Sequence, residues 1–256
     1  MRPAAGTRRA LCVILLGAGL AGCSALSTDP ADSSGEIDLR AAPTPGLRIS
    51  YQVRTTATVS GAGVRGLIDS EKAASTFQRY SLEVSEINAE WFDVRITGDG
   101  LPGVVVASFA SDWSARRFGV ETEGVFASSD LASFPILGEG FQLSRDLSGH
   151  WRIGEARPWM RTFSLPPMLK VEMKGTATLR RLTRRSGRRA AEFELGASGE
   201  GEYAASRLRM SLIGRCWIDL ATGFTLETKT SAPGQFTQAG GPVNMEILEE
   251  RESRGL

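Results

Sequence analysis

The chain has 256 residues, with 30 lysines and arginines against 29 aspartates and glutamates, and its formal net charge is +1. A charge this close to zero is not that of a generally basic nucleic-acid-binding protein or of an acidic, solvated chain. The length beyond the N-terminal segment is ample for one hydrophobic core, and no second domain is indicated.

Residues 1–22 have the parts of a bacterial lipoprotein signal peptide. Arginines without an acid precede an apolar run, ALCVILLGAGLA, that is too short to cross a bilayer as a helix. The run ends in LAGC, which matches a lipobox and makes Cys23 the predicted lipidation site. A plain secretory signal and a twin-arginine signal, suggested by Thr7-Arg8-Arg9, are the alternatives.

An acylated Cys23 predicts a protein of the cell envelope that is anchored in a membrane by its lipid and faces the periplasm. Ser24 stands where an aspartate would indicate inner-membrane retention in some bacteria, so the outer membrane is favoured over the inner membrane. Export excludes nucleic acid as a partner. Cys12 leaves with the signal peptide, so Cys216 has no disulfide partner, and we expect it to be a buried and inert thiol.

Residues 23–46 are short on apolar side chains and rich in Ser, Ala, Asp and Pro. This composition predicts a lipidated N-terminus followed by a flexible tether, with a typical reach of roughly 25 Å. Residues 47–256 are predicted to form a single all-β domain.

From Leu47 onward, apolar and polar residues alternate with a period of two, as in ISYQVRTTATV, YSLEVSEI, VEMKGTATLRRL and AEFELGASGEGEY. This pattern is typical of antiparallel strands with one buried and one wet face. Turn signals such as SG at 186–187 and DLATG at 219–223 separate the segments. A sheet of so many long strands has to manage its edges, so we expect one large, strongly curved antiparallel sheet or a half-open barrel.

Two mid-chain segments, residues 128–140 and 154–169, lack the alternation and contain prolines. They are predicted to form short helices or packed loops that fill the concave side of the sheet. The second segment contains an aromatic and thioether-rich run that would suit an apolar ligand, with plain core filling as the alternative. The candidate ligand-binding residues are Trp159, Met160, Phe163, Leu165, Met168 and Leu169.

The stretch RRLTRRSGRR, residues 180–189, holds six arginines around Ser186-Gly187, which predicts a basic hairpin tip. The tip is either simply solvated or in contact with anionic lipid, where each cation contributes about 1 kcal/mol. The candidate membrane-contact residues are Arg180, Arg181, Arg184, Arg185, Arg188 and Arg189.

Nothing in the sequence favours an enzyme. His150 is the only histidine, and the GxSxG, HExxH and CxxC motifs are missing from the sequence. Catalysis would need His150 close to Cys216 or to paired carboxylates. We therefore expect no catalytic residue, no metal site and no cofactor.

The lipobox, the polar tether and the long antiparallel meander together resemble the LolA/LolB/LppX-like superfamily of periplasmic lipid-handling lipoproteins, or a related family of exported bacterial β-domains. GHWRIGEARP and GRCWIDLATGFTLET are among the stretches that carry this resemblance. It implies a half-open barrel that holds an apolar ligand or its own helices. The expected function is therefore binding of a hydrophobic or lipidic ligand by a membrane-anchored lipoprotein, and the alternative is a structural or assembly lipoprotein that acts through a protein partner.

Overall fold

Long antiparallel strands make up nearly all of the folded part of this protein. The folded unit of the chain lies within residues 32–256. The computed structural model describes residues 35–61, 72–129, 141, 143–165, 169–203, 206–238 and 241–254, all of which belong to this unit. The predicted signal peptide and Cys23 lie outside the described residues.

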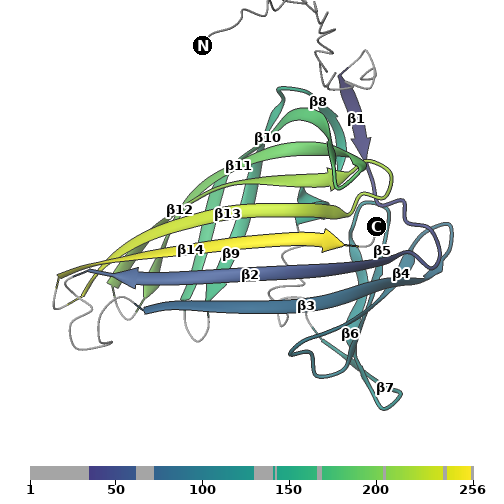
Figure 1. Cartoon of the computed structure of the whole chain (residues 1–256), viewed down its shortest axis with the longest axis horizontal. Helices are drawn as coiled ribbons and strands as arrows, with labels where there is room; N and C mark the ends of the chain where they lie inside the picture. The colour runs from purple at the N-terminus through teal and green to yellow at the C-terminus, as the bar shows by residue number, and fades with distance from the viewer. Residues whose placement is uncertain are drawn as a thin grey trace, which may run out of the picture. The chain divides into compact units, whose positions relative to one another are not determined.

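Twelve strands form one sheet in the order β7-β6-β5-β4-β3-β2-β14-β13-β12-β11-β10-β9, and every neighbouring pair is antiparallel (Figure 1). The N-terminal meander consists of β2 (Arg48–Ser60), β3 (Lys72–Ile87), β4 (Phe92–Gly98), β5 (Val104–Phe109), β6 (Ala115–Thr122) and β7 (Val125–Ser128). The C-terminal meander consists of β9 (Ala156–Leu165), β10 (Leu169–Arg185), β11 (Arg188–Tyr203), β12 (Ser206–Asp219), β13 (Thr225–Gln238) and β14 (Gly241–Arg254).

A second, two-stranded sheet pairs β1 (Glu36–Leu39) with β8 (Gly149–Arg152). Leu39 is buried in the same core cluster as Trp151 of β8. The predicted tether over residues 23–46 is therefore wrong in its C-terminal part, because residues 36–39 form a strand. The alternation of Ile37 and Leu39 with polar neighbours supplies the apolar side chains that this pairing buries.

The period of two gives the large sheet an apolar face and a polar face. On β2, for example, Ile49, Tyr51 and Val53 are buried while Ser50 and Arg54 are exposed. Two core clusters occupy the apolar face. One contains residues from β10 to β14, and the other contains residues from β2 to β6.

Segments between the strands cover parts of the apolar face. Leu143 and Leu147, from a helical turn around residues 143–146, pack in the cluster of the C-terminal meander. In the cluster of the N-terminal meander, Trp113 packs edge-on against Phe224, with ring centroids 4.8 Å apart. Phe224 belongs to the β12–β13 loop, so this contact ties the two meanders together beyond the sheet itself.

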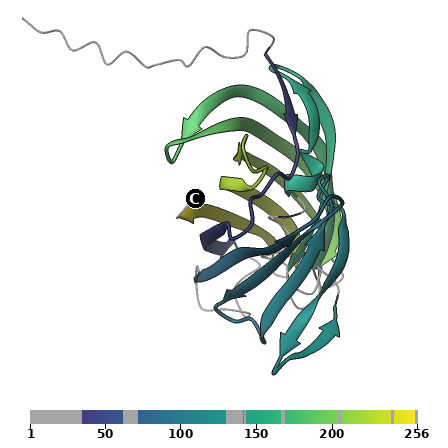
Figure 2. The same cartoon turned by 90° about the vertical axis from the view of Figure 1, so that its right-hand side faces the viewer.

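The sheet is open, with β7 and β9 as its two edges (Figure 2). The prediction of antiparallel β-structure is confirmed, but the sheet is neither closed nor strongly curled as expected for a half-open barrel. Closure is not needed to bury apolar surface here, because β1, β8, the helical turn and the β12–β13 loop cover parts of that face.

The predicted short helices are also wrong for the described mid-chain residues, which contain only the helical turn around residues 143–146. Residues 156–165 form strand β9 and pair with residues 169–178 of β10. Pro158 is tolerated because β9 is an edge strand, where a missing N–H can face away from the ladder. Residues 130–140 lie outside the described part of the chain. Within the described residues, no helix is long and apolar enough to cross a membrane.

The close approach of β10 to β11 yields a prediction about stability. A Cβ on Gly175 would overlap the carbonyl oxygen of Gly196, whereas a Cβ on Gly196 would meet no atom within 4 Å. We expect Gly175→Ala to lower the free energy of unfolding by about 2 kcal/mol or more, because the overlap forces the strands apart. The matched Gly196→Ala variant should change it by less than about 0.5 kcal/mol. Urea denaturation of both variants measures the difference, and equal midpoints would contradict it.

Candidate functional site

Trp159 of β9 is the predicted ligand residue whose surroundings fit that role best. Its side chain is 5% exposed and packs in the core cluster of the C-terminal meander. The indole Nε1 atom is buried and has no hydrogen-bond partner among the described residues. An unpaired buried donor costs about 1–3 kcal/mol, so this N–H is a place where an acceptor atom would be stabilised.

Of the other predicted ligand residues, Met160 does not lie on the same face as Trp159. Met160 is 56% exposed, because neighbouring residues of a strand point to opposite faces. The backbones of Phe163 and Leu165 lie in β9 and that of Leu169 begins β10, but their side chains are outside the described part of the chain. Met168 is outside it altogether.

On the half of the apolar face formed by the N-terminal meander, core filling is the better interpretation. A pocket bounded there by Tyr51, Tyr80, Phe141 and Phe224, among other residues, has a volume of about 10 Å³. Such a volume holds at most one water molecule. The Tyr51 hydroxyl donates a hydrogen bond to the Thr225 carbonyl oxygen at 3.0 Å, so the polar group of this tyrosine is satisfied by the fold.

The arginine-rich stretch forms the predicted hairpin tip. Arg185 pairs with Arg188 across the turn, and Ser186 and Gly187 have φ angles of 50° and 79°. Two successive positive φ angles are those of a type I′ turn, whose twist matches that of the flanking strands. The prediction of a hairpin with Ser186-Gly187 at its apex is confirmed.

Most of the arginines at this tip are held by carboxylates of the same chain, in an arrangement that we call the arginine clasp. The four ion pairs are Arg180–Glu194 (2.6 Å), Arg181–Glu192 (2.8 Å), Arg185–Glu227 and Arg188–Asp219 (2.6 Å). Three of these carboxylate side chains are at most 7% exposed, whereas Glu194 is at the surface. The tip therefore presents much less positive charge than its six arginines suggest.

Arg185 also connects the tip to the strands beyond its own hairpin. Its guanidinium lies 4.8 Å from the ring centroid of Trp217, which packs with Ala190 and Leu226 in a small separate cluster. Burial acts to raise the pKa of Glu227, but the hydrogen bonds from Arg185 and Lys229 outweigh it and hold the pKa below its ordinary value. Glu227 therefore stabilises the fold when ionised, and this contribution is lost as the pH falls through the depressed pKa.

One ion pair of the arginine clasp can be predicted from the sequence. A hairpin symmetric about Ser186-Gly187 places Arg181 opposite Glu192, and the two residues are indeed paired. Glu227 and Asp219 are the partners that sequence reasoning missed. They are 42 and 31 residues from their arginines, and no local pattern identifies them.

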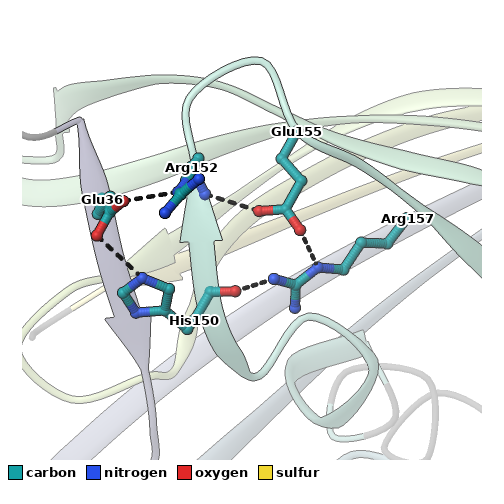
Figure 3. Close-up of polar contacts among 5 residues, drawn as sticks. All are labelled: Glu36, His150, Arg152, Glu155 and Arg157. Carbon is teal, nitrogen blue, oxygen red and sulfur yellow. Dashed lines mark hydrogen bonds and ion pairs between the residues drawn. The ribbon is translucent and has the colours of Figure 1, made fainter.

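His150 belongs to a charged cluster between β1, β8 and the start of β9 (Figure 3). Glu36 accepts a hydrogen bond from Arg152 Nε at 2.6 Å and lies 3.2 Å from His150 Nε2. Glu155 accepts hydrogen bonds from the Arg152 backbone N–H at 2.9 Å and from Arg157 Nε at 2.7 Å. The hydrogen bond from Arg152 and its charge hold the pKa of Glu36 below its ordinary value. These contacts fasten β1 to the body of the domain.

His150 and Cys216 are not brought together. The His150 side chain is 59% exposed, whereas Cys216 is fully buried on the apolar face. Burial raises the pKa of the Cys216 thiol to about 12, which makes it a poor nucleophile at neutral pH. Among the described residues, no group of three or more His, Cys, Asp or Glu side chains could hold a metal ion.

Neither a protein-family model nor a curated protein matches this sequence significantly. The functional argument therefore depends on the fold and on the side chains described above.

The clasp predicts different effects for two neighbouring arginines. Arg188→Gln leaves Asp219, which is 1% exposed, without its charged partner. We expect it to lower the free energy of unfolding by about 2 kcal/mol, because an uncompensated buried charge is costly. Arg189→Gln changes an exposed side chain and should cost less than about 0.5 kcal/mol. Chemical denaturation at neutral pH compares the two, and equal losses would show that Arg188 is an ordinary surface arginine.

Proposed function

We propose that this chain is a bacterial lipoprotein, anchored in a membrane through Cys23 and facing the periplasm, that binds a hydrophobic or lipidic ligand without catalysing a reaction. The outer membrane is the favoured location. This is the function that the resemblance to the LolA/LolB/LppX-like superfamily implies. It needs an apolar surface on the protein and at least one point at which the polar part of a lipid is recognised.

The observation that carries the proposal is the buried indole N–H of Trp159. It lies in an otherwise apolar cluster with residues such as Met173, Ala177 and Trp151. An apolar ligand would add burial of about 25 cal/mol per Å² of its surface. An ester carbonyl or phosphate oxygen on the same ligand would accept the hydrogen bond that the described residues leave unmade. Lipids combine these two features in one molecule.

The proposal includes contact of the hairpin tip with anionic lipid, but with fewer arginines than the sequence suggests. Four of the six candidate arginines have carboxylate partners, so their charges are largely compensated. Arg189 is exposed at the tip, where a single cation near a charged membrane contributes about 1 kcal/mol. The lipid on Cys23 therefore supplies most of the anchoring energy.

Assembly with a protein partner is the second candidate function, and the β9 edge favours it. In the described sheet β9 pairs with β10 on one side and with no strand on the other. Such an edge accepts an extended segment of another protein by adding a strand. Met160, which is 56% exposed on this strand, would be covered in that assembly.

The ligand proposal predicts that the full-length protein copurifies with a lipid. Native mass spectrometry should show a ligand-bound species, and solvent extraction should release the lipid. Trp159→Phe keeps the aromatic packing and removes the N–H, so we expect about three- to tenfold less bound ligand, which corresponds to one neutral hydrogen bond. Trp91→Phe, at a half-buried position outside the core clusters, is the matched control. Ligand-free protein from membranes would refute the proposal, and a protein partner retained after lipid extraction would support the assembly function instead.

The anchoring proposal predicts that Cys23→Ser releases the protein from membranes. Loss of the thiol removes the atom that carries the acyl chains, and two or three chains are what makes anchoring stable. The wild-type chain should partition into the detergent phase of a Triton X-114 extraction, and its intact mass should show loss of residues 1–22 together with added lipid. Detergent-phase partitioning of the Cys23→Ser variant, equal to that of the wild type, would rule this anchor out.

A further inference from the structure

The polar face of the large sheet contains an open depression of about 590 Å³ near the ends of β2, β12, β13 and β14, which we call the polar trough. Its lining is formed by Thr58, Ser60, Arg209, Met210, Ser211, Pro233, Gly234, Gln235, Asn244, Met245 and Glu246. The trough lies on the opposite face from Trp159, so a ligand there would be distinct from the lipid proposed above.

Strand register arranges the polar side chains of the trough in two rows. Arg209, Gln235, Asn244 and Ser60 are successive cross-strand partners and form the first row. In the second row, Pro233 pairs with Glu246 and Glu246 pairs with Thr58. Neighbouring strands are about 4.8 Å apart, so the first row extends over roughly 14 Å and the second over roughly 10 Å, which are spans that suit a short oligosaccharide.

Pro233 is an unusual residue at this place in the sheet. Strand β13 lies between β12 and β14, and prolines are otherwise confined to edge strands or bulges. The ladder between β12 and β13 includes the pair Met210–Gly234 and resumes at Ile213–Ser231, with no pairing of the described residues in between. A proline here weakens the sheet and places an exposed apolar ring on the polar face. That ring offers a surface on which the C–H groups of a sugar can pack.

Two carboxamides at the centre of the trough present a specific pattern of hydrogen-bonding groups. Gln235 Nε2 donates to Asn244 Oδ1 at 3.2 Å. This bond leaves the Gln235 carbonyl oxygen as an acceptor and the Asn244 amide N–H groups as donors. An acetamido group carries one N–H donor and one C=O acceptor, so it would complete the pair from the opposite side.

We propose that the polar trough binds an oligosaccharide that contains N-acetylated amino sugars. The acetamido N–H donates to Gln235, and its carbonyl oxygen accepts from Asn244. The hydroxyl groups of Thr58, Ser60 and Ser211 form hydrogen bonds with hydroxyl groups of the sugar, because a serine or threonine hydroxyl can both donate and accept. Arg209, which also pairs with Glu200 at 3.1 Å, adds a charged donor to the lining. Glu246, which also accepts a hydrogen bond from Ser231 Oγ at 3.2 Å, adds a charged acceptor. This proposal does not depend on the lipid ligand.

The test uses the full-length chain and N,N′,N″-triacetylchitotriose in isothermal titration calorimetry. We expect saturable binding with a dissociation constant of roughly 0.1–1 mM, a range typical of a small, open site. Deacetylated chitotriose and maltotriose, which lack the acetamido group, should bind at least about fivefold more weakly, since each lost hydrogen bond reduces binding by about that factor.

Variants then locate the site. Asn244→Ala and Gln235→Ala should each weaken binding of triacetylchitotriose about five- to tenfold. Ser50→Ala, on the same face near the opposite end of β2, should leave it unchanged. The three substituted residues are exposed, and circular dichroism checks that each variant is folded. The proposal is overturned if triacetylchitotriose does not saturate the wild type, if all three sugars bind equally, or if neither trough variant weakens binding.

Discussion

The pairing of β2 with β14 joins the two halves of the large sheet. Within each half, neighbouring strands follow one another in the sequence, so only this pairing connects one meander to the other through the sheet. Every other neighbouring pair in the large sheet consists of strands that are consecutive in the sequence. The β2–β14 ladder instead joins residues 50–60 to residues 244–254, across almost the whole folded chain. Closing so long a loop costs conformational entropy that only an extended set of contacts can offset. The contacts of Phe224 with Trp113 and Phe92 add to that set at one end of the sheet.

Once the two meanders are joined, the apolar face presents more surface than one layer of strands can bury. The protein covers it with segments from different parts of the chain, including β1, β8, the helical turn around residues 143–146 and the β12–β13 loop. In the cluster of the N-terminal meander the filling is aromatic and nearly complete, with a residual pocket of about 10 Å³. In the cluster of the C-terminal meander, the buried indole Nε1 of Trp159 has no hydrogen-bond partner among the described residues. This unpaired indole N–H is the physical basis for proposing a ligand at the cluster of the C-terminal meander.

Features of the fold that depend on local spacing could be predicted from the sequence. Alternation with a period of two identified the strand-rich class, and Ser186-Gly187 identified the apex of a hairpin. Strand β9 was missed because Pro158 and the weak alternation around it do not predict a strand. Pairing with β10 forms the strand in spite of this low local β-propensity. Strand β1 was missed because Ile37 and Leu39 are the only large apolar residues between residues 27 and 46, although they alternate with polar residues as strand residues do. The partners of Arg185 and Arg188 depend on which strands become neighbours, which no local pattern contains.

The two faces of the large sheet give the protein two independent chemical surfaces on the same strands. Substitution of an apolar-face residue changes core packing, whereas its immediate neighbours in the sequence point to the polar face and tolerate exchange. The arginine clasp follows the same rule, since its carboxylates belong to strands whose alternate residues build the core. Gln235 and Asn244 are likewise the immediate sequence neighbours of Phe236 and Val243 of the apolar face. A saccharide site on one face and a lipid site on the other would therefore be able to evolve separately, because each draws on side chains that the other does not use.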